Sequence, residues 1–269
     1  MITLAGLFVY PVKSCRGIGI DATVLTAAGL EHDREWMIVT PDGRFLTQRE
    51  EPRLALISTR LEPDALWLSA PGARPLEVTF QRAGTPAEVV VWRDHCHARD
   101  EGDGAARWLA AYLGRPLRLV RFDETHRRQS DQAFTGDTPG FTRFADGYAL
   151  LAISQASLDD LNSRLATALP MNRFRPNLVL EGLGPHGEDG LGEFVVGDDI
   201  RLKAVKPCTR CAITTTDQDT GKVDGVEPLR TLKTYRWNSS LRGVEFGQNV
   251  IVVAGAGRTI RLGMEIRVA

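Results

Sequence analysis

Two cysteines three positions apart are the residues whose type and spacing most directly suggest chemistry. Residues 206–211 read KPCTRC, so Cys208 and Cys211 lie beside the cations Lys206 and Arg210. Neighbouring positive charge favours the thiolate, which is the metal-binding form of cysteine. Thiolates are preferred ligands of soft transition metals. One use of this segment would therefore be to bind a metal such as molybdenum through a single cysteine.

Three other interpretations of the pair stay open on spacing alone. A structural zinc site needs four nitrogen or sulfur ligands, and the His-Cys-His segment at 95–97 could supply the missing ones only if the fold brought it close. A thioredoxin-like redox pair would begin a helix, whereas residues 212–216 are rich in β-branched side chains and predict a strand. Both cysteines could also be small buried hydrophobic residues.

Three further segments carry cations next to expected strands. Arg175 and Asn177 flank a proline that fixes an extended turn, and an arginine fork can bind a phosphate through two hydrogen bonds. Lys13 and Ser14 follow the first expected strand, and Arg34 precedes a hairpin. Each segment by itself is better explained as solvated surface. Together they would suit an anionic ligand.

Short strands separated by proline and glycine are expected along most of the chain. The hairpin is the clearest, because residues 35–40 and 45–48 flank Pro-Asp-Gly-Arg at 41–44, which suits a tight turn. The other expected strands are 2–10, 19–25, 54–61, 65–68, 76–80, 87–92, 116–122, 177–180, 193–196, 200–205, 212–216, 249–253 and 259–268.

Few helices are expected. Asp103 can cap a helix that runs to Leu113 and stops at Gly114. Ser154 starts another, in which leucines recur at helical spacing until Pro170 ends it. A short helix is expected near 227–235, and the polar segment 123–146 is expected to be a long loop or a crossing between domains.

These elements predict an α+β chain with a β-rich domain over residues 1–122 and a second, β-barrel-like domain over 123–269 with a few peripheral helices. A hydrophobic content of 43% in 269 residues is enough for two cores. Thirty-three basic and 34 acidic residues give a formal net charge of −1, which argues against nucleic acid or a membrane surface as partner. Four cysteines are too few for a disulfide framework, and the first residues lack a signal-peptide pattern, so we expect a cytoplasmic protein.

Five segments taken together resemble a known family. They are VYPVKSC at 9–15, GLEHDREW at 29–36, QREEPRL at 48–54, RFRPN at 173–177 and CTRC at 208–211. In order and spacing they are similar to MOSC-domain proteins, most of all to the mitochondrial amidoxime-reducing component and its bacterial YcbX-type relatives. The resemblance covers essentially the whole chain and implies a MOSC N-terminal-type first domain and a MOSC second domain.

The resemblance implies a molybdenum cofactor, the metal bound to molybdopterin, in a cleft between the two domains. Cys211 would be the metal ligand and catalytic residue, with Cys208 as the fallback. The implied cofactor contacts come from both domains and are Lys13, Ser14, Arg34, Asp146, Gly147, Arg175, Asn177, Thr209, Arg210 and Asn249.

The implied activity is the two-electron reduction of N-hydroxylated or other N-oxygenated small molecules. Because no ferredoxin-like extension follows Ala269, a separate electron-donor protein of the ferredoxin, flavodoxin or cytochrome type is expected. No membrane anchor of the kind that mitochondrial relatives use is expected. The alternative, also drawn from MOSC relatives, is a non-catalytic cofactor carrier or a sulfur-transfer module.

Overall fold

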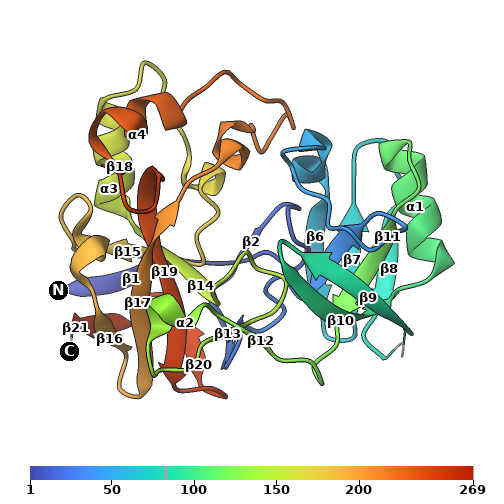
Figure 1. The fold of residues 1–269 in the computed structure, drawn as a ribbon, viewed down its shortest axis with the longest axis horizontal. Helices are drawn as coiled ribbons and strands as arrows, with labels where there is room; N and C mark the ends of the chain where they lie inside the picture. The colour runs from blue at the N-terminus through green and yellow to red at the C-terminus, as the bar shows by residue number, and fades with distance from the viewer. Residues whose placement is uncertain (82–83, 269) are drawn as a thin grey trace.

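A closed barrel of seven strands forms the left half of the molecule in Figure 1. The structure is a computed structural model that describes residues 1–81 and 84–268. Only β14 and β15 pair in parallel within the ring; the other pairs are antiparallel. In pairing order the ring is β14 (Leu150–Ser154), β15 (Leu178–Glu181), β1 (Ile2–Val9), β21 (Glu265–Val268), β16 (Glu193–Val196), β17 (Ile200–Thr209) and β19 (Gly243–Ala254), which pairs again with β14.

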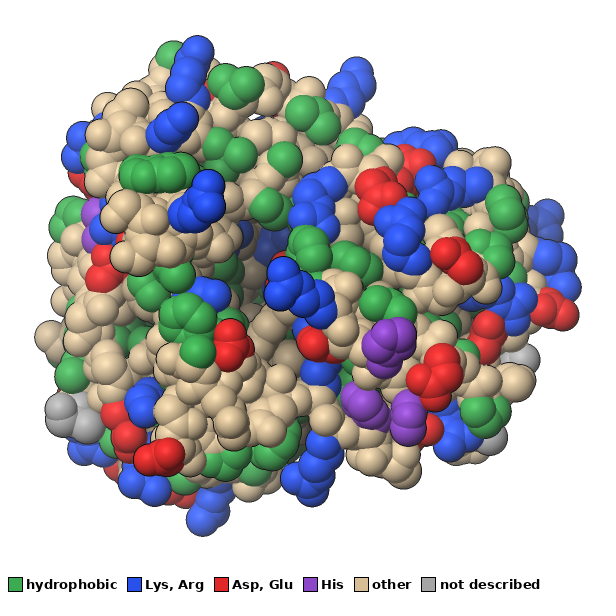
Figure 2. All heavy atoms as spheres, viewed as in Figure 1, with side chains coloured by type: hydrophobic (Ala, Val, Ile, Leu, Met, Phe, Trp, Pro, Cys, Tyr) green, Lys and Arg blue, Asp and Glu red, His purple; other side chains and the backbone are tan. Residues whose placement is uncertain are grey.

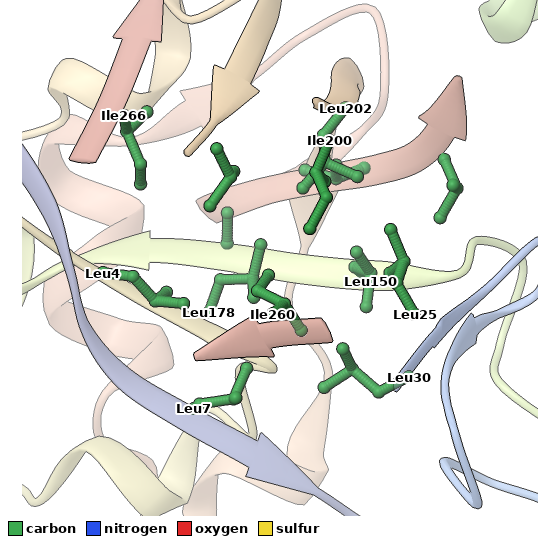
Figure 3. Close-up of a cluster of buried hydrophobic side chains, with 14 of the residues drawn as sticks. Leu4, Leu7, Leu25, Leu30, Leu150, Leu178, Ile200, Leu202, Ile260 and Ile266 are labelled. Carbon is green, nitrogen blue, oxygen red and sulfur yellow. The ribbon is translucent and has the colours of Figure 1, made fainter. Parts of the chain in front are cut away.

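Branched aliphatic side chains fill the barrel, as Figure 3 shows. Leu4 and Leu7 of β1 both point into this core, although they are three positions apart, an odd spacing that in a regular strand would put them on opposite faces. The register of β1 against β15 shifts between Leu4 and Gly6. A bulge of this kind changes which face later residues present, so it lets both leucines enter the core.

A small sheet adds to the same core. It consists of β20 (Thr259–Arg261), β3 (Ala22–Thr26) and β4 (Gly29–Leu30). Leu25, Leu30 and Ile260 from these strands pack with the barrel leucines. Residues from the first thirty of the chain are therefore part of the barrel core.

The right half of Figure 1 is a smaller unit, residues 35–122, which we call the lobe. One sheet has the order β5 (Trp36–Val39), β11 (Arg118–Phe122), β10 (Asp94–Asp100) and β9 (Thr85–Val91). A second sheet has the order β6 (Ser58–Glu62), β7 (Ala65–Ser69) and β8 (Leu76–Thr79). Helix α1 (Asp103–Leu113) buries Leu109 and Leu113 in the core that also contains Trp36.

The remaining elements are short; the 3-10 turn Pro52–Leu56 belongs to the lobe, and the others surround the barrel. The short elements are β2 (Ile18–Gly19), β12 (Arg128–Gln129), α2 (Gln132–Thr135), β13 (Phe141–Thr142), α3 (Gln155–Ser163), α4 (Leu229–Tyr235), β18 (Trp237–Asn238) and four 3-10 turns at Pro52–Leu56, Met171–Arg173, Gly187–Gly190 and Ala212–Thr215.

The fold class predicted from the sequence is confirmed: the chain is β-rich with few helices and contains a barrel. The helix from Asp103 to Leu113 is confirmed, and Gly114 ends it with a φ of 76°. Its first-turn cap is Gly102 rather than Asp103. The hairpin turn at Gly43 is present, with Val39 opposite Phe45.

Several expectations about elements were wrong. The expected last strand 259–268 is two strands in different sheets, and the expected strand 45–48 is reduced to an isolated bridge at Phe45. Residues 212–216 form a 3-10 turn instead of a strand, and the expected strand 54–61 begins as a 3-10 turn. Helix α3 ends at Ser163 instead of reaching Pro170. The expected loop 123–146 carries three short elements.

The division of the sequence at residue 122 remains a prediction as a boundary along the chain. In space, β1 lies between β15 and β21, so the first strand belongs with the C-terminal strands. Within the described part of the chain, no helix combines the length and apolar character that a membrane crossing requires.

Candidate functional site

A hollow lies between the barrel and the lobe, and the space-filling view shows the surface recessed there with lysine and arginine side chains around it (Figure 2). All eleven residues that the sequence nominated line this hollow: Lys13, Ser14, Arg34, Asp146, Gly147, Arg175, Asn177, Thr209, Arg210, Cys211 and Asn249. They come from separate stretches of the chain, which only the fold brings together.

Three of these residues hold a left-handed backbone. The φ angles of Ser14, Arg34 and Arg175 are 67°, 47° and 57°. Non-glycine residues rarely adopt this conformation, and backbone strain of about 1–3 kcal/mol tends to occur where function requires it. All three residues line the hollow.

Two guanidinium groups stack on one tyrosine ring. The ring of Tyr10 lies 4.1 Å from the Arg34 guanidinium carbon and 4.3 Å from that of Arg175. Arg34 is paired with Asp33 at 2.6 Å, and it also donates to the Asn177 side chain at 3.0 Å. The Asn177 amide donates to Phe8 O at 3.1 Å, so this side chain holds Arg34 in place and ties it to β1.

Arg175 differs from Arg34 because no described carboxylate forms an ion pair with it. Its Nη1 donates to the carbonyl of Cys15 at 2.7 Å, and the residue is only 9% exposed. Burial lowers the pKa of the Arg175 guanidinium to about 10. A buried cation without a counter-charge is costly. The geometry therefore favours an anion in the hollow beside Arg175.

Arg210 is a second cation without a carboxylate partner among the described residues. It donates to the sulfur of Cys208 at 3.0 Å and to Phe174 O at 2.6 Å. Its Nε is buried and has no hydrogen-bond partner in the described part of the chain. A buried N–H without a partner leaves a hydrogen-bond donor available to a ligand.

Lys13 joins the two sides of the hollow. Its ammonium donates to Phe144 O at 2.7 Å and to the Asp146 carboxylate at 2.6 Å. Burial lowers the pKa of Lys13, and the charge of Asp146 partly opposes that shift. The Trp92 indole donates to the same Asp146 oxygen at 3.0 Å.

The two thiols sit at the end of β17. Cys208 is half-buried within that strand, and Cys211 is exposed at the residue that begins the following 3-10 turn. The other two cysteines, Cys15 and Cys96, are buried. Cys208 and Cys211 therefore differ from buried structural cysteines, which removes that interpretation of the pair.

The zinc interpretation lacks a set of ligands. The described residues contain no group of three or more His, Cys, Asp or Glu side chains placed to hold a metal ion. His97 lies on β10 of the lobe, and its ring is tilted against that of His126 with ring centroids 4.9 Å apart. Neither histidine lines the hollow.

Sequence reasoning left out several residues that also line the hollow. They are Thr47, Ala145, Tyr148, Leu150, Leu151, Phe174 and Ile213, together with Cys208, which was named only as a fallback. The signal for Tyr148 was its position directly after Asp146 and Gly147. The aliphatic residues gave no signal, because their spacing is that of ordinary core strands.

Comparisons with known proteins point to one family. Residues 1–116 match the MOSC N-terminal beta barrel domain, and residues 140–267 match the MOSC domain. The mitochondrial amidoxime-reducing component 1 of Mus musculus is 39% identical over 244 residues, covering 87% of this chain and 71% of that protein. The mitochondrial amidoxime reducing component 2 of Bos taurus is 37% identical over 243 residues, covering 87% of this chain and 72% of that protein. A protein of Oryza sativa subsp. japonica named molybdenum cofactor sulfurase is 32% identical over 296 residues, covering 98% of this chain and 35% of that protein.

Proposed function

The chain belongs to the family of MOSC-domain proteins that includes the mitochondrial amidoxime-reducing components, and from that premise we propose that it is a molybdenum-cofactor-dependent oxidoreductase. Its substrates would be N-hydroxylated or other N-oxygenated small molecules, reduced by two electrons. The observation that carries the proposal is the combination, in one hollow, of an exposed thiol with cations that lack carboxylate partners in the described structure.

The residues present fit such a cofactor. Cys211 would bind the metal, because its thiol is exposed and the two buried cysteines are out of reach. Arg175 and Arg210 would hold the anionic part of the pterin, since both are partly or fully buried without an ion pair among the described residues. Lys13, Ser14 and Arg34 would add further contacts to the cofactor from the side of the hollow that continues into the lobe. Bidentate, charge-assisted contacts of this kind suit phosphate.

When bound, the cofactor would supply the two-electron reduction chemistry. The overall change balances when an N–OH group, two electrons and two protons give an N–H group and water. The chain's own residues would bind the cofactor and orient the substrate beside it. The buried cations would fix the cofactor, and the aliphatic wall of Leu150, Leu151 and Ile213 would limit the water next to it.

A second candidate function is a cofactor carrier or a sulfur-transfer module. The observation that favours it is the match of 98% of this chain to the protein named molybdenum cofactor sulfurase. The oxidoreductase and the carrier or sulfur-transfer module differ in whether they turn over an N-hydroxylated substrate. Only the oxidoreductase would reduce an amidoxime repeatedly when the loaded protein receives electrons from a synthetic donor.

The test is metal and pterin analysis of protein made in a host that synthesises the cofactor. Wild type should contain molybdenum and pterin in near-equal amounts close to one per chain. Cys211→Ser should lose the metal or the activity, whereas Cys208→Ser serves as the matched thiol control and should keep both. Zinc in place of molybdenum, or the absence of both metal and pterin, would overturn the proposal. The cytoplasmic location and the separate electron donor stay predictions.

A further inference from the structure

A second hollow continues from the first one and contains Lys206, a lysine that forms no ion pair with any described residue. Six residues line both hollows: Asp146, Gly147, Tyr148, Cys208, Thr209 and Asn249. The second hollow adds Asp94, Arg128, Gln129, Asp131 and Lys206. Because Cys208 and Thr209 form part of both walls, a molecule in the second hollow would lie next to the thiol segment.

The side chain of Lys206 leaves β17 at an irregular point of the strand. The register of β17 against β19 shifts between Ala204 and Lys206, so the strand bulges at this point. Bulges commonly re-aim a side chain next to an active site. Here the Lys206 ammonium lies 4.1 Å from the ring centre of Phe134 and 6.0 Å from that of Tyr148.

The other charged residues that line the second hollow each have a partner of their own. Arg128 pairs with Asp94 at 2.7 Å, and Asp146 pairs with Lys13 at 2.6 Å. The Asp131 side chain accepts a hydrogen bond from Ala133 N and so caps α2. Among described residues, no ion pair joins Lys206 to any of these carboxylates. Two aromatic rings hold its charge in place without neutralising it.

The wall next to Lys206 also contains a buried phenol. Tyr148 is 9% exposed, lines both hollows, and its hydroxyl has no hydrogen-bond partner in the described part of the chain. Burial and then the charge of Asp131 raise the pKa of Tyr148 to about 12, so the phenol stays protonated and neutral. The ammonium of Lys206 is therefore the group at this wall that attracts an anion, and a carboxylate can accept a charge-assisted hydrogen bond from it.

We propose that the second hollow is a substrate subsite in which Lys206 selects N-oxygenated compounds that carry a carboxylate at the end remote from the N–O group. The inference rests on the proposed reductase function and names its substrate class. Asp131 limits the preference, because its negative charge faces the same hollow. Removing that charge should strengthen binding of the carboxylate.

The experiment compares an aromatic amidoxime with its para-carboxylate derivative on the cofactor-loaded protein with a synthetic electron donor. Wild type should show the higher kcat/KM for the carboxylate. Lys206→Met should lower the ratio of the two kcat/KM values about tenfold, mainly through KM. Lys206→Arg should retain most of the preference, and Asp131→Asn, which can still cap α2, should increase it.

Lys233→Met is the matched control. Lys233 also lies over an aromatic ring, 5.7 Å from the centre of Trp237, but it lines neither hollow. Its substitution should leave the ratio unchanged. Calorimetry with the carboxylated amidine product gives a second measure: binding should weaken about tenfold in Lys206→Met and stay unchanged in Lys233→Met.

The outcomes separate this inference from the proposed function. If wild type reduces both compounds without preference, or if Lys206→Met keeps the preference, the subsite is refuted while the reductase stands. If wild type reduces neither, the proposed function fails. If Lys206→Met loses pterin and molybdenum, Lys206 serves the cofactor's anion instead of the substrate, and the subsite proposal is overturned.

Discussion

Three residues with a strained backbone show how single positions determine the lining of the hollow. Ser14, Arg34 and Arg175 combine a left-handed backbone with a place in the lining of the hollow. None of them is a glycine, so each contributes a side chain at a cost in backbone energy. The chain retains these residues where the cations must converge, and no comparable cost is needed for the aliphatic part of the wall.

The cysteines make a prediction at the same scale. Burial raises the pKa of the Cys15 thiol to about 12 and also raises the pKa of Cys96, whereas Cys208 and Cys211 are accessible. A thiolate-specific reagent at pH 8 should therefore modify two of the four cysteines of the folded, cofactor-free protein quickly. Absorbance of the released chromophore counts the thiols.

The thiol count also has a control. Cys211→Ser should reduce the fast count by one, and raising the pH from 8 to 10 should leave Cys15 unmodified, because its pKa stays above that range. Rapid labelling of three or four thiols in the folded protein would contradict the burial of Cys15 and Cys96.

Individual site residues were predictable from residue type and spacing. The thiol segment, the arginine before Pro176 and the lysine after the first strand each stand out in the sequence. Their conformations were not predictable. The φ of 57° at Arg175 depends on Tyr10 and Cys15, which are 165 and 160 positions away along the chain and meet it only in the fold.

At the scale of elements, side-chain hydrogen bonds outweigh the strand and helix propensities of two segments. The segment after Cys211 is β-branched, yet Thr214 and Thr215 donate to the carbonyls of Cys211 and Ala212 at 3.0 and 2.8 Å. Such bonds offer the backbone an alternative to a strand. Helix α3 likewise stops early because Asn162 bonds both the N–H and the carbonyl of Leu169, which turns the chain back.

A buried carboxylate stabilises the junction of two strands in the lobe and makes stability depend on pH. Glu35 accepts from Arg121 of β11 at 2.6 Å and pairs with His32 at 2.8 Å. Burial alone would raise the pKa of Glu35, but the His32 hydrogen bond and the Arg121 charge outweigh it, and the pKa lies below its ordinary value. The ionised form therefore favours the folded state.

Glu35→Gln should reduce the free energy of unfolding by about 2 kcal/mol at pH 7. The contribution of a carboxyl with a depressed pKa is complete above the ordinary value of about 4.3 and is lost as the pH falls through the folded-state value. The difference between wild type and variant should shrink below about pH 4. Urea unfolding at about pH 7 and about pH 3.5 measures it.

Glu50→Gln is the control for that change. Glu50 pairs with Arg44 at 2.8 Å, but both side chains are well exposed, so the variant should differ from wild type by less than about 1 kcal/mol at either pH. If the Glu35→Gln deficit grew on acidification, the ionised carboxylate would not be the form that favours folding.

The described residues of the whole molecule form four buried hydrophobic clusters, and the barrel needs both ends of the sequence. The α+β class and the β-rich character followed from strand and turn patterns. Which strands are neighbours did not follow, because β1 pairs with β15 and β21, more than a hundred residues away, and local patterns carry no information about distant partners.

The barrel gives a prediction at this scale. A fragment of residues 123–269 lacks β1 and the β3–β4 strands, so its ring would have a gap between β15 and β21 and an incomplete core. It should show no cooperative thermal transition by circular dichroism. Adding a separate peptide of residues 1–30 should restore structure at least in part. A cooperative transition in the fragment alone would show that the C-terminal segment folds independently.

A contact between the lobe and the segment that follows the thiols combines a neutral hydrogen-bonded pair with a neighbouring ion pair. The side-chain amides of Gln48 and Gln218 donate to each other at 3.1 and 2.9 Å, and both residues are buried. Beside them, Arg16 and Asp219 form an exposed ion pair at 2.6 Å. Dissolved salt shortens the range over which exposed charges interact, from about 10 Å at 0.1 M to about 3 Å at 1 M, but has little effect on a buried dipole pair. The spacing between the thiols and the cations should therefore stay the same from low to high salt concentration, while the Arg16–Asp219 ion pair weakens.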